Sequence, residues 1–378
     1  MRFLHIADLH IGKRIHEASL LEEQEYILQE ILDKVDRLAL DGVLMAGDIY
    51  DKAVPSAEAV DLFDRFLHGL AQKQVKIFII SGNHDSPERV AFGAGIMSRS
   101  GIFLAPVYRG MVTPITLKDQ WGEVDVFLLP FVKPAHVKRF FPEADINSYN
   151  DAIKTALGGL VLAPNRRRVL VTHQFITGAV RSESEDISVG GTDNVDAGLF
   201  ADFDYVALGH LHGPQFVGRD TVRYCGTPLK YSFSEAGHEK SLTVVELREA
   251  GAVEISTIPL TPRRDMRIIR GCYDEITAKC FYEGTNREDY LHVILTDEED
   301  IPEALGKLRS IYPHILRLEY DNKRTRASGV FAPVDKAEQK DPMAWFSDFY
   351  RLQNGQELSE EQRNFLETMA QSIWGNES

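Results

Sequence analysis

Short apolar runs alternate along the chain with longer segments whose apolar residues recur at helical spacing. The runs cover residues 3–7, 43–46, 77–80, 169–172 and 205–208. Each run is short and bounded by Gly, Asp or Asn, which is typical of buried β-strands. Between the first three runs, residues 20–38 and 60–70 carry apolar residues on one helical face, and Ser56 is a candidate N-cap for the second helix. The pattern predicts a layered βαβ-type core.

Strand patterns follow one another closely after residue 215. Residues 222–225, 242–247 and 253–258 have this pattern, and we expect them to form an antiparallel sheet that completes the first domain. Two prolines, Pro259 and Pro262, then interrupt the pattern. We therefore assign residues 1–262 to the first domain.

A smaller pattern and a helical tail follow this boundary. Residues 263–325 contain three strand patterns and one helical pattern, enough for a small α+β domain, and the charged residues 326–341 have the composition of a linker. Residues 342–378 predict two helices, the second with a capping box at Ser359 and Gln362. These helices carry more apolar surface than they can bury in each other. They either fold back on the main body or dock on helices of another protein, and we favour docking.

The charge balance limits which partners the chain can bind unaided. The 378 residues include 42 Lys and Arg and 57 Asp and Glu, a formal net charge of -15, so the chain as a whole repels a phosphate backbone. Nucleic-acid binding would need a local basic patch, bound divalent cations or a partner subunit. The sequence has three cysteines without a CxxC pair, and it has no apolar run long enough for a signal peptide or a membrane helix. We therefore predict a cytoplasmic protein.

Five polar motifs follow the predicted strands of the first domain. They are Asp8-Leu9-His10, Gly47-Asp48, Gly82-Asn83-His84-Asp85, Thr172-His173 and Gly209-His210-Leu211-His212. Strands of one sheet end on a shared edge, so we expect these side chains to converge on one site. Imidazole, carboxylate and amide ligands without thiolates suit Mn, Fe, Co or Zn. More ligands are present than one tetrahedral ion needs, which favours two ions bridged by a carboxylate.

Neighbours of these motifs also carry expectations. A glycine precedes Asp48, Asn83 and His210, and we expect each glycine to let the backbone turn sharply as its strand ends. His5 has the same strand parity as Ala7, so it should point into the sheet as a core residue or as a support for the site.

The five motifs, in this order over residues 8–212, resemble those of the calcineurin-like metallophosphoesterases. Three further features extend the resemblance over essentially the whole chain, to a DNA-repair nuclease branch of this family. They are the run Gly226-Thr227-Pro228 before Tyr231-Ser232-Phe233, the run Ile49-Tyr50-Asp51 after Asp48, and the later domains. The resemblance implies an α/β fold: a layered β-sandwich flanked by helices, with a small α+β capping domain that faces DNA and a C-terminal helical hairpin.

The resemblance also implies roles for the motif residues. One metal ion would be held by Asp8, His10, Asp48 and His212, and a second by Asp48, Asn83, His173 and His210, with Asp48 bridging and Mn²⁺ as the expected ion at both positions. His84 would bind no metal. It would stabilise the transition state or protonate the leaving oxygen while an activated water attacks phosphorus in line.

Two acidic residues beside these ligands carry separate expectations. Asp85 either orients His84 or caps a helix before Ser86 and Pro87. Homologues in archaea and eukaryotes often carry a histidine at the position of Asp51, so the histidine's role does not transfer, and we expect Asp51 to hydrogen-bond a ligand imidazole instead.

The implied activity is exonuclease action on double-stranded ends, 3' to 5', and endonuclease action on single strands and hairpins. No G-x-x-x-x-G-K-[ST] motif occurs, so ATP hydrolysis would come from a partner, a coiled-coil ATPase of the SMC type docked on residues 342–378. The resemblance further implies a nucleoid-associated homodimer, with the N-terminal helix or the helix after Ser56 as its face.

Several basic clusters are candidate DNA contacts. They are residues 166–168, Lys133 with Lys138 and Arg139, Arg263 with Arg264, and Lys323 with Arg324 and Arg326; the loop 188–191 could also approach DNA. Two other functions remain open. An enzyme acting on small phosphodiesters or nucleotides would use the same ligands, and a non-catalytic scaffold would be expected to have lost some of them. All seven ligands and His84 are present.

Overall fold

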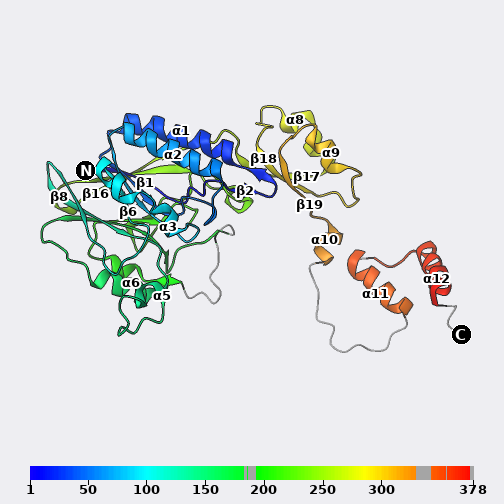
Figure 1. Cartoon of the computed structure of the whole chain (residues 1–378). Helices are drawn as coiled ribbons and strands as arrows, with labels where there is room; N and C mark the ends of the chain where they lie inside the picture. Colours follow the sequence, from blue (N-terminus) through cyan, green and yellow to red (C-terminus); the bar gives the residue numbers. More distant parts are fainter. Residues whose placement is uncertain (183–184, 186–192, 329–341, 355, 375–378) are drawn as a thin grey trace. The chain divides into compact units, whose positions relative to one another are not determined.

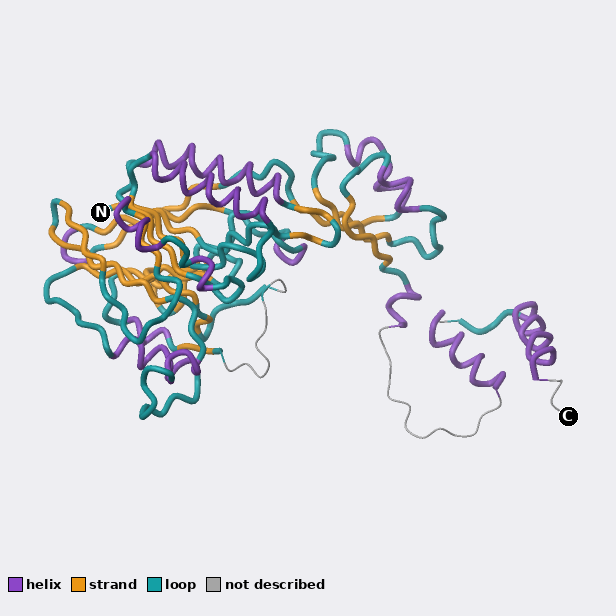
Figure 2. The backbone as a smooth tube through the Cα atoms, viewed as in Figure 1, coloured by secondary structure: helices purple, strands orange, loops and turns teal. Residues whose placement is uncertain are grey.

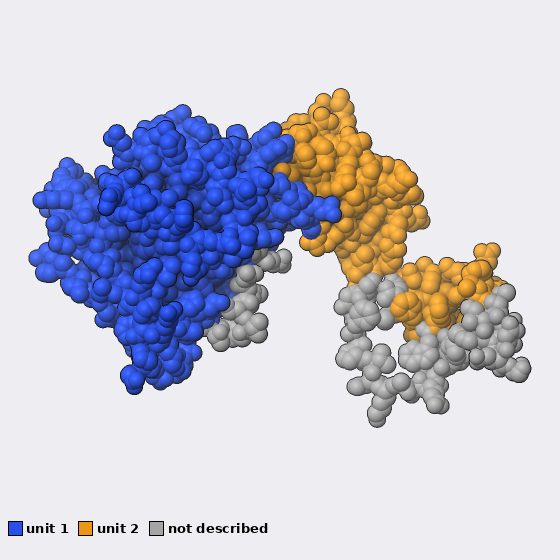
Figure 3. Space-filling view, in the orientation of Figure 1, with its two compact units in different colours: residues 1–265 blue, residues 266–378 orange. Residues whose placement is uncertain are grey.

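Two sheets packed face to face form the body that carries the motifs in the computed structural model (Figures 1 and 2). The structure describes residues 1–182, 185, 193–328, 342–354 and 356–374. They divide into two units, residues 1–265 and 266–378 (Figure 3).

The first sheet of unit 1 has the strand order β16-β15-β1-β4-β5-β6. Its parallel strands are β1 (Arg2–Ile6), β4 (Gly42–Ala46), β5 (Lys76–Ile80) and β6 (Ile102–Leu104), and β15 (Ser241–Leu247) and β16 (Val253–Pro259) are antiparallel. Helices α1 (Leu21–Leu38) and α2 (Ala57–Gln72) connect the first three strands, as predicted. The Ser56 hydroxyl caps α2 by accepting a hydrogen bond from the backbone nitrogen of Ala59 at 3.3 Å.

The second sheet has the strand order β13-β14-β12-β9-β8-β7. Its strands are β7 (Ile115–Asp119), β8 (Gly122–Leu129), β9 (Arg167–His173), β12 (Tyr205–Gly209), β13 (Gln215–Val217) and β14 (Arg219–Tyr224). The prediction that residues 222–258 form one antiparallel sheet is therefore wrong. β14 runs parallel to β12 in this sheet, whereas β15 and β16 belong to the first sheet. Their partners lie far away in sequence, and the local pattern contains no information about pairing.

Short elements complete unit 1. They are β2 (Arg14–Ile15), β3 (Ala18–Ser19), α3 (Pro87–Val90), α4 (Ala94–Met97), η1 (Ser98–Ser100), α5 (Pro134–Lys138), α6 (Tyr149–Gly158), β10 (Phe175–Ile176), β11 (Asn194–Val195), η2 (Ala197–Phe200), η3 (Phe233–Glu235) and η4 (Glu249–Gly251). Helices α1 and α2 lie on one outer side of the two sheets, and α5 and α6 lie on the other (Figure 1).

Alternating strand residues fill the space between the two sheets. Phe3 and Phe78 of the first sheet and Val171 and Tyr205 of the second are fully buried in this core. Burying each such side chain stabilises the fold by roughly 1.5–3 kcal/mol. His5 lies in the same layer, as predicted, with its Nδ1 2.8 Å from the Tyr205 hydroxyl. The core fixes the sheets together, and the carboxyl ends of their parallel strands carry the motifs.

A buried arginine ties the two sheets together at their edges. Arg167 Nη1 donates to Asp119 Oδ2 and to the backbone oxygen of Leu247, both at 3.0 Å. Asp119 ends β7 in the second sheet, while Leu247 ends β15 in the first. The Asp119 carboxylate also lies 2.7 Å from the amino group of Met1. Because Arg167 is buried and paired, it stabilises the sandwich and does not serve as a DNA contact.

Replacing Asp119 with asparagine should lower the free energy of unfolding by about 3 kcal/mol at pH 7, because it leaves Arg167 buried without its counter-charge. Burial alone would raise the pKa of Asp119, but hydrogen bonds from Arg167 and Met1 outweigh it and hold the pKa below its usual range. A carboxylate with a lowered pKa contributes its full stability above about pH 4 and loses it as the pH falls further. Urea denaturation at pH 7 and pH 3 measures both effects.

Glu254→Gln is the matched control, because Glu254 forms an exposed ion pair with Arg248. Such pairs contribute about 0–1 kcal/mol. The role of the Arg167 contact would be contradicted if Asp119→Asn changed the free energy of unfolding at pH 7 no more than the control does. It would also be contradicted if the difference between wild type and Asp119→Asn increased at low pH.

Unit 2 begins with a three-stranded parallel sheet. Its strands are β17 (Met266–Gly271), β18 (Tyr290–Leu295) and β19 (Ile315–Tyr320), and the helices α7 (Tyr273–Thr277), α8 (Lys279–Tyr282) and α9 (Ala304–Arg309) connect them. Leu291, Val293, Leu308 and Tyr312 are buried in its own small core.

Three helices follow β19. They are α10 (Lys323–Ser328), α11 (Pro342–Asn354) and α12 (Glu360–Trp374). The first of these covers the start of the predicted linker, and residues 329–341 of that linker lie outside the described residues. The capping box predicted for the last helix is confirmed, since the backbone nitrogen of Ser359 donates to Gln362 Oε1 at 3.0 Å and that of Gln362 donates to Ser359 Oγ at 3.2 Å. Across the described ranges, no helix is both long and apolar enough to cross a membrane.

Candidate metal centre

The structure brings all nine motif residues together at one edge of the two sheets. Asp8 and His10 follow β1, Asp48 follows β4, Asn83 to Asp85 follow β5, His173 ends β9, and His210 and His212 follow β12. All are buried except Asn83 and His84, which are half-buried. The side chains converge as predicted, but they do not come from one sheet. The motifs after β1, β4 and β5 belong to the first sheet, and those at the ends of β9 and β12 belong to the second.

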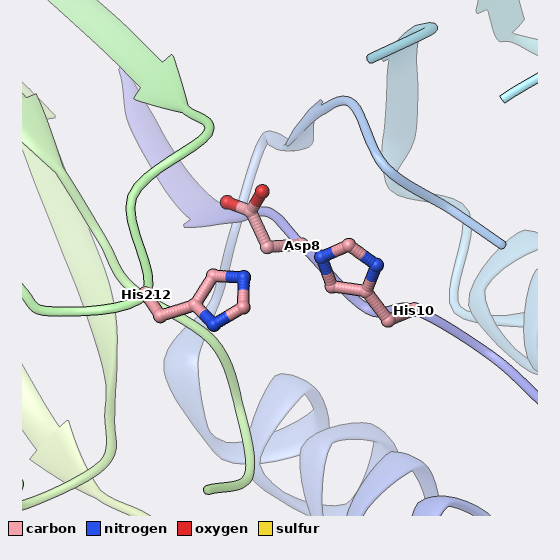
Figure 4. Close-up of side chains that lie close together, drawn as sticks. All are labelled: Asp8, His10 and His212. Carbon is pink, nitrogen blue, oxygen red and sulfur yellow. The ribbon is translucent and has the colours of Figure 1, made fainter. Parts of the chain in front are cut away.

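One group of side chains comes from two segments that lie far apart in the sequence. Asp8, His10 and His212 each offer one ligand atom, and these atoms lie within 4.8 Å of one another. Figure 4 shows the three side chains approaching one another from the loop after β1 and the segment after β12. The backbone nitrogen of His210 donates to both carboxylate oxygens of Asp8, at 3.0 and 3.1 Å, which fixes this carboxylate.

A second group surrounds the amide oxygen of Asn83. This oxygen lies 3.0 Å from His173 Nε2 and 3.0 Å from His210 Nδ1. Divalent ions bind nitrogen and oxygen ligands at about 2.1 Å, so ligand atoms of one ion lie about 3 Å apart when their bonds are near right angles. The amide oxygen therefore lies at the spacing of two ligands of one ion from each of the two ring nitrogens.

Asp48 lies between the two groups. Its Oδ2 is 3.4 Å from His173 Nε2 in one group and 3.8 Å from His10 Nε2 in the other. Its Oδ1 accepts a hydrogen bond from the backbone nitrogen of His84 at 2.9 Å. One carboxylate oxygen thus faces both groups, which is the arrangement of a bridging ligand.

The residues present fit two divalent ions. Both ring nitrogens of His10 are buried, and among the described residues neither has a hydrogen-bond partner. Leaving a buried polar atom without a partner costs about 1–3 kcal/mol, a cost that coordination of an ion would remove. The donor atoms are imidazole nitrogens and carboxylate or amide oxygens, without thiolates, which suits borderline and hard divalent metals.

Four ligand residues have strained backbones. Asp8, His10, Asp48 and His210 have φ values of 54°, 43°, 49° and 107°, in the left-handed region that residues other than glycine rarely adopt. Each such conformation costs on the order of 1–3 kcal/mol and persists where the surrounding structure enforces it. Of the nine non-glycine residues with positive φ in the described part of the chain, four therefore belong to this cluster.

The glycines beside the ligands are needed for two different reasons. Gly47 has φ +89°, so it allows the predicted turn. Gly82 and Gly209 do not have a positive φ, so close packing rather than conformational freedom explains why they are glycines. A Cβ on Gly209 would lie 1.9 Å from the Ala46 oxygen, and one on Gly82 would lie 2.1 Å from Asp48 Oδ1. Only glycine lets these segments approach each other so closely.

Burial sets the protonation of the centre. Burial lowers the pKa of His10 well below its usual value and that of His210 to about 3, so both rings are neutral. Burial would also lower the pKa of His173, but the Asp48 charge outweighs it and raises the pKa to about 9. Burial raises the pKa of Asp8 to about 7.

His84 lies beside the two groups at the more open side of the centre. Its Nδ1 is 3.0 Å from the backbone oxygen of Asp51, and its ring meets the His10 ring edge-on at 4.7 Å between centroids. His10, Asp48 and His84 also lie close enough to form a possible ligand group, and so do Asp8, Asp48 and His173.

Asp51 does not make the predicted contact, and Asp85 has partners that the sequence did not indicate. The Asp51 carboxylate lies 3.9 Å from His10 Nδ1, too far for the expected hydrogen bond, and pairs with Lys13 at 2.8 Å. Asp85 accepts hydrogen bonds from the backbone nitrogens of Ile49, Tyr50 and Gly82, at 3.2, 3.0 and 2.9 Å. Its carboxylate thus ties the loop after Asp48 to the loop that carries Asn83 and His84.

Two residues that contact the site, Gln24 and Tyr231, were given no role from the sequence. Gln24 Nε2 donates to the backbone oxygens of Leu9 and His10, at 3.1 and 2.8 Å, and holds the first motif from the side of α1. The Tyr231 ring packs edge-on against the rings of His10 and His212. A signal for Gln24 exists, because this polar residue lies four residues after Leu20 on the apolar face of its helix.

Comparisons with known proteins agree with this geometry. The calcineurin-like phosphoesterase family model matches residues 1–214, and the model SbcD_C, described as the type 5 capsule protein repressor C-terminal domain, matches residues 262–354. A Staphylococcus epidermidis protein, named as the SbcD component of the nuclease SbcCD, is 31% identical over 381 residues, covering 100% of both chains. A Staphylococcus saprophyticus protein of the same name is 29% identical over 377 residues, covering 99% of this chain and 98% of the relative.

The family models match residues in both units, and the first of them spans every motif residue from Asp8 to His212. The chain therefore belongs to the calcineurin-like phosphoesterases and, within them, to the SbcD family of nuclease subunits.

Proposed function

We propose that this chain is a two-metal DNA nuclease subunit that cuts double-stranded ends as a 3' to 5' exonuclease and single strands and hairpins as an endonuclease. The observation that carries this proposal is the position of Asp48, which faces one ligand group through His10 and the other through His173. In this proposal Asp8, His10, Asp48 and His212 hold one ion, and Asp48, Asn83, His173 and His210 hold the other, with Mn²⁺ at both positions.

The two ions, when bound, would supply an activated water and neutralise the charge that develops on the phosphate. The chain's own residues position the phosphate and move the proton. The backbone oxygen of Asp51, 3.0 Å from His84 Nδ1, fixes the tautomer and direction of the His84 ring. The other ring nitrogen can then stabilise the transition state or give a proton to the leaving oxygen when the ring carries both protons, as an imidazolium.

A basic segment near the centre supports a polymeric substrate. The Phe131 ring meets the His173 ring edge-on at 6.2 Å, and Lys133, Lys138 and Arg139 on and beside α5 are exposed shortly after it along the chain. The other predicted clusters are engaged in ion pairs: Arg166 with Asp125, Arg264 with Glu23 and Arg324 with Asp300. The loop 188–191 lies outside the described residues. The residues near Phe131 are therefore our choice for a backbone contact.

The proposal includes the partners. An SbcC-type coiled-coil ATPase would bind residues 342–378, while the α+β domain at 263–325 would face DNA. A homodimer would form through α1 and α2, where Tyr26 and Val60 are 44% and 45% exposed. Such a complex would act on DNA in the cytoplasm, at the nucleoid.

A cleavage assay tests the nuclease activity. The purified chain, incubated with Mn²⁺, should cut both a labelled DNA hairpin and a bis-aryl phosphodiester, and EDTA should abolish both activities. Raising the salt concentration should weaken hairpin cleavage more than diester hydrolysis, because only the polymer depends on several phosphate contacts. Hydrolysis of the diester alone, even with the SbcC-type partner added, would favour the alternative enzyme that acts on small phosphodiesters or nucleotides.

A further inference from the structure

A buried pair of opposite charges lies behind His212. Glu235, at the end of η3, is fully buried, and the Lys240 side chain is 4% exposed. Glu235 Oε1 lies 3.0 Å from His212 Nδ1, and Glu235 Oε2 accepts a hydrogen bond from Lys240 Nζ at 2.6 Å. Neither residue belongs to the ligand groups. Both follow the Gly226-Thr227-Pro228 run, for which the proposed chemistry has no use.

Lys240 uses its ammonium protons to hold this arrangement. Besides Glu235, it donates to Thr227 Oγ1 at 2.6 Å and to the backbone oxygen of His212 at 3.0 Å. The Thr227 hydroxyl in turn donates to the backbone oxygen of Leu229 at 2.7 Å. The ammonium is therefore fixed at three points, and it balances the buried carboxylate.

The contact between Glu235 and His212 selects one tautomer of the histidine. A carboxylate oxygen can only accept, so His212 Nδ1 carries the proton and donates it. The lone pair then lies on Nε2, the nitrogen on the far side of the ring, which is the ligand atom available to the group that contains Asp8 and His10 (Figure 4). Carboxylate partners of this kind orient a ligand histidine and raise its basicity.

The second ligand group has a different support. His173 Nδ1 lies 2.8 Å from the backbone oxygen of Ala46, a neutral acceptor. The two metal positions are therefore supported by different chemistry: a buried charge pair behind one and a peptide carbonyl behind the other.

We propose that Glu235 and Lys240 are positioning residues that fix the His212 tautomer and so set the metal affinity of the position formed by Asp8, His10 and His212, separately from the Asn83 position. This inference rests on the proposed function only in that the ligand groups bind divalent ions. It does not depend on which phosphodiester is cut.

Glu235→Gln tests the tautomer directly. If the new amide nitrogen faces His212, it donates to Nδ1 and moves the ring proton to Nε2, where it blocks coordination. If the amide oxygen faces His212 instead, the amide nitrogen opposes the Lys240 ammonium. Both orientations are unfavourable, so we expect the first position to bind Mn²⁺ roughly 10–100-fold more weakly, with the second position unchanged.

The double variant Glu235→Gln/Lys240→Met separates this mechanism from simple loss of packing. Without the ammonium, the amide oxygen can accept from His212, and the amide nitrogen can face Thr227 Oγ1, which lies 3.4 Å from Glu235 Oε2. The backbone oxygen of His212 keeps a donor in the backbone nitrogen of Thr227 at 3.2 Å. We therefore expect the double variant to recover metal affinity to within a few-fold of wild type.

The measurement is titration of the full chain with Mn²⁺, followed by calorimetry and by the electron paramagnetic resonance signal of free Mn²⁺, which resolves the two binding events without a cleavage assay. Glu239→Gln, a change at an exposed neighbour, is the matched control and should bind as wild type does. If Glu235→Gln does not fold, Glu235→Asp keeps the charge at a greater distance and should weaken the same position to a smaller extent.

Three results would overturn the inference: unchanged affinity at both positions in Glu235→Gln, equal weakening of both positions, or a double variant that binds no better than the single one. Wild-type protein that binds two ions but cuts no phosphodiester would instead contradict the proposed function and leave this inference standing.

Discussion

Replacing His84 with glutamine should lower cleavage of both DNA hairpin and bis-aryl phosphodiester by about 10²–10⁴-fold, the contribution of a well-placed general acid. The variant should still bind two Mn²⁺ ions. Glutamine keeps a side chain that can donate a hydrogen bond, but it cannot give up a proton near neutral pH. The expected result is thus a protein that binds metal and DNA and fails in the chemical step.

The geometry gives His84 two possible roles. Its contact with the Asp51 oxygen directs the ring beside the centre, as a proton donor requires. Its position near His10 and Asp48 would also allow it to bind a metal. The ligand groups around Asn83 and Asp8 are complete without it, so we favour the first role.

Mn²⁺ titration and single-turnover cleavage measured on the same preparation separate these roles. His68→Gln, at an exposed position on α2, is the control and should match wild type in both assays. Cleavage by His84→Gln within a few-fold of wild type would remove His84 from the chemistry. Loss of one ion would make it a ligand.

The sequence was most informative where one local rule governs several segments. The motif residues from Asp8 to His212 all follow short apolar strands, and parallel strands must end on a common edge. That rule accounts for the motifs within each sheet. The packing of the two sheets, which brings His173, His210 and His212 to the other motif residues, is not contained in the local pattern. The helices after residues 20 and 56 are equally local, since an apolar face and an N-cap define them.

Pairings between distant segments could not be predicted in the same way. β15 joins the first sheet beside β1, and Phe3 pairs with Val245, although more than 200 residues separate them. β8 was missed although residues 126–129 form an apolar run, because no polar motif follows that run and Asp125 precedes it. This carboxylate is buried and accepts from Thr116 and Arg166 at 2.6 and 3.1 Å. A buried polar residue with tertiary partners looks like a surface residue in the sequence.

The supports of the metal centre were invisible for a related reason. Asp85, Glu235 and Lys240 act through contacts with backbone atoms and side chains from other segments. Their residue types are common on protein surfaces, and no spacing marks them. Gly82 and Gly209 were singled out correctly but for the wrong reason. Their glycines are needed because another segment approaches closely, and such an approach cannot be predicted from the local sequence.

A chain that ends at Arg326 should lose co-purification with an SbcC-type ATPase entirely, while it keeps Mn²⁺-dependent hydrolysis of the small phosphodiester. The metal centre lies within residues 1–265, which have their own buried core. The truncation removes α11 and α12, on which Phe349 and Phe365 are 58% and 65% exposed. Apolar helix surface of this kind is what a docking segment offers to a partner's helices.

Co-expression followed by affinity capture of the ATPase measures the loss. Because a truncation removes many contacts at once, the full-length double variant Phe349→Ser/Phe365→Ser should reproduce it by removing only the exposed aromatic surface. The alternative, in which the tail folds back on the main body, predicts the reverse. In that case both altered chains would still co-purify with the ATPase, and the truncated chain would melt at a lower temperature because surface that the tail had covered would be exposed to water.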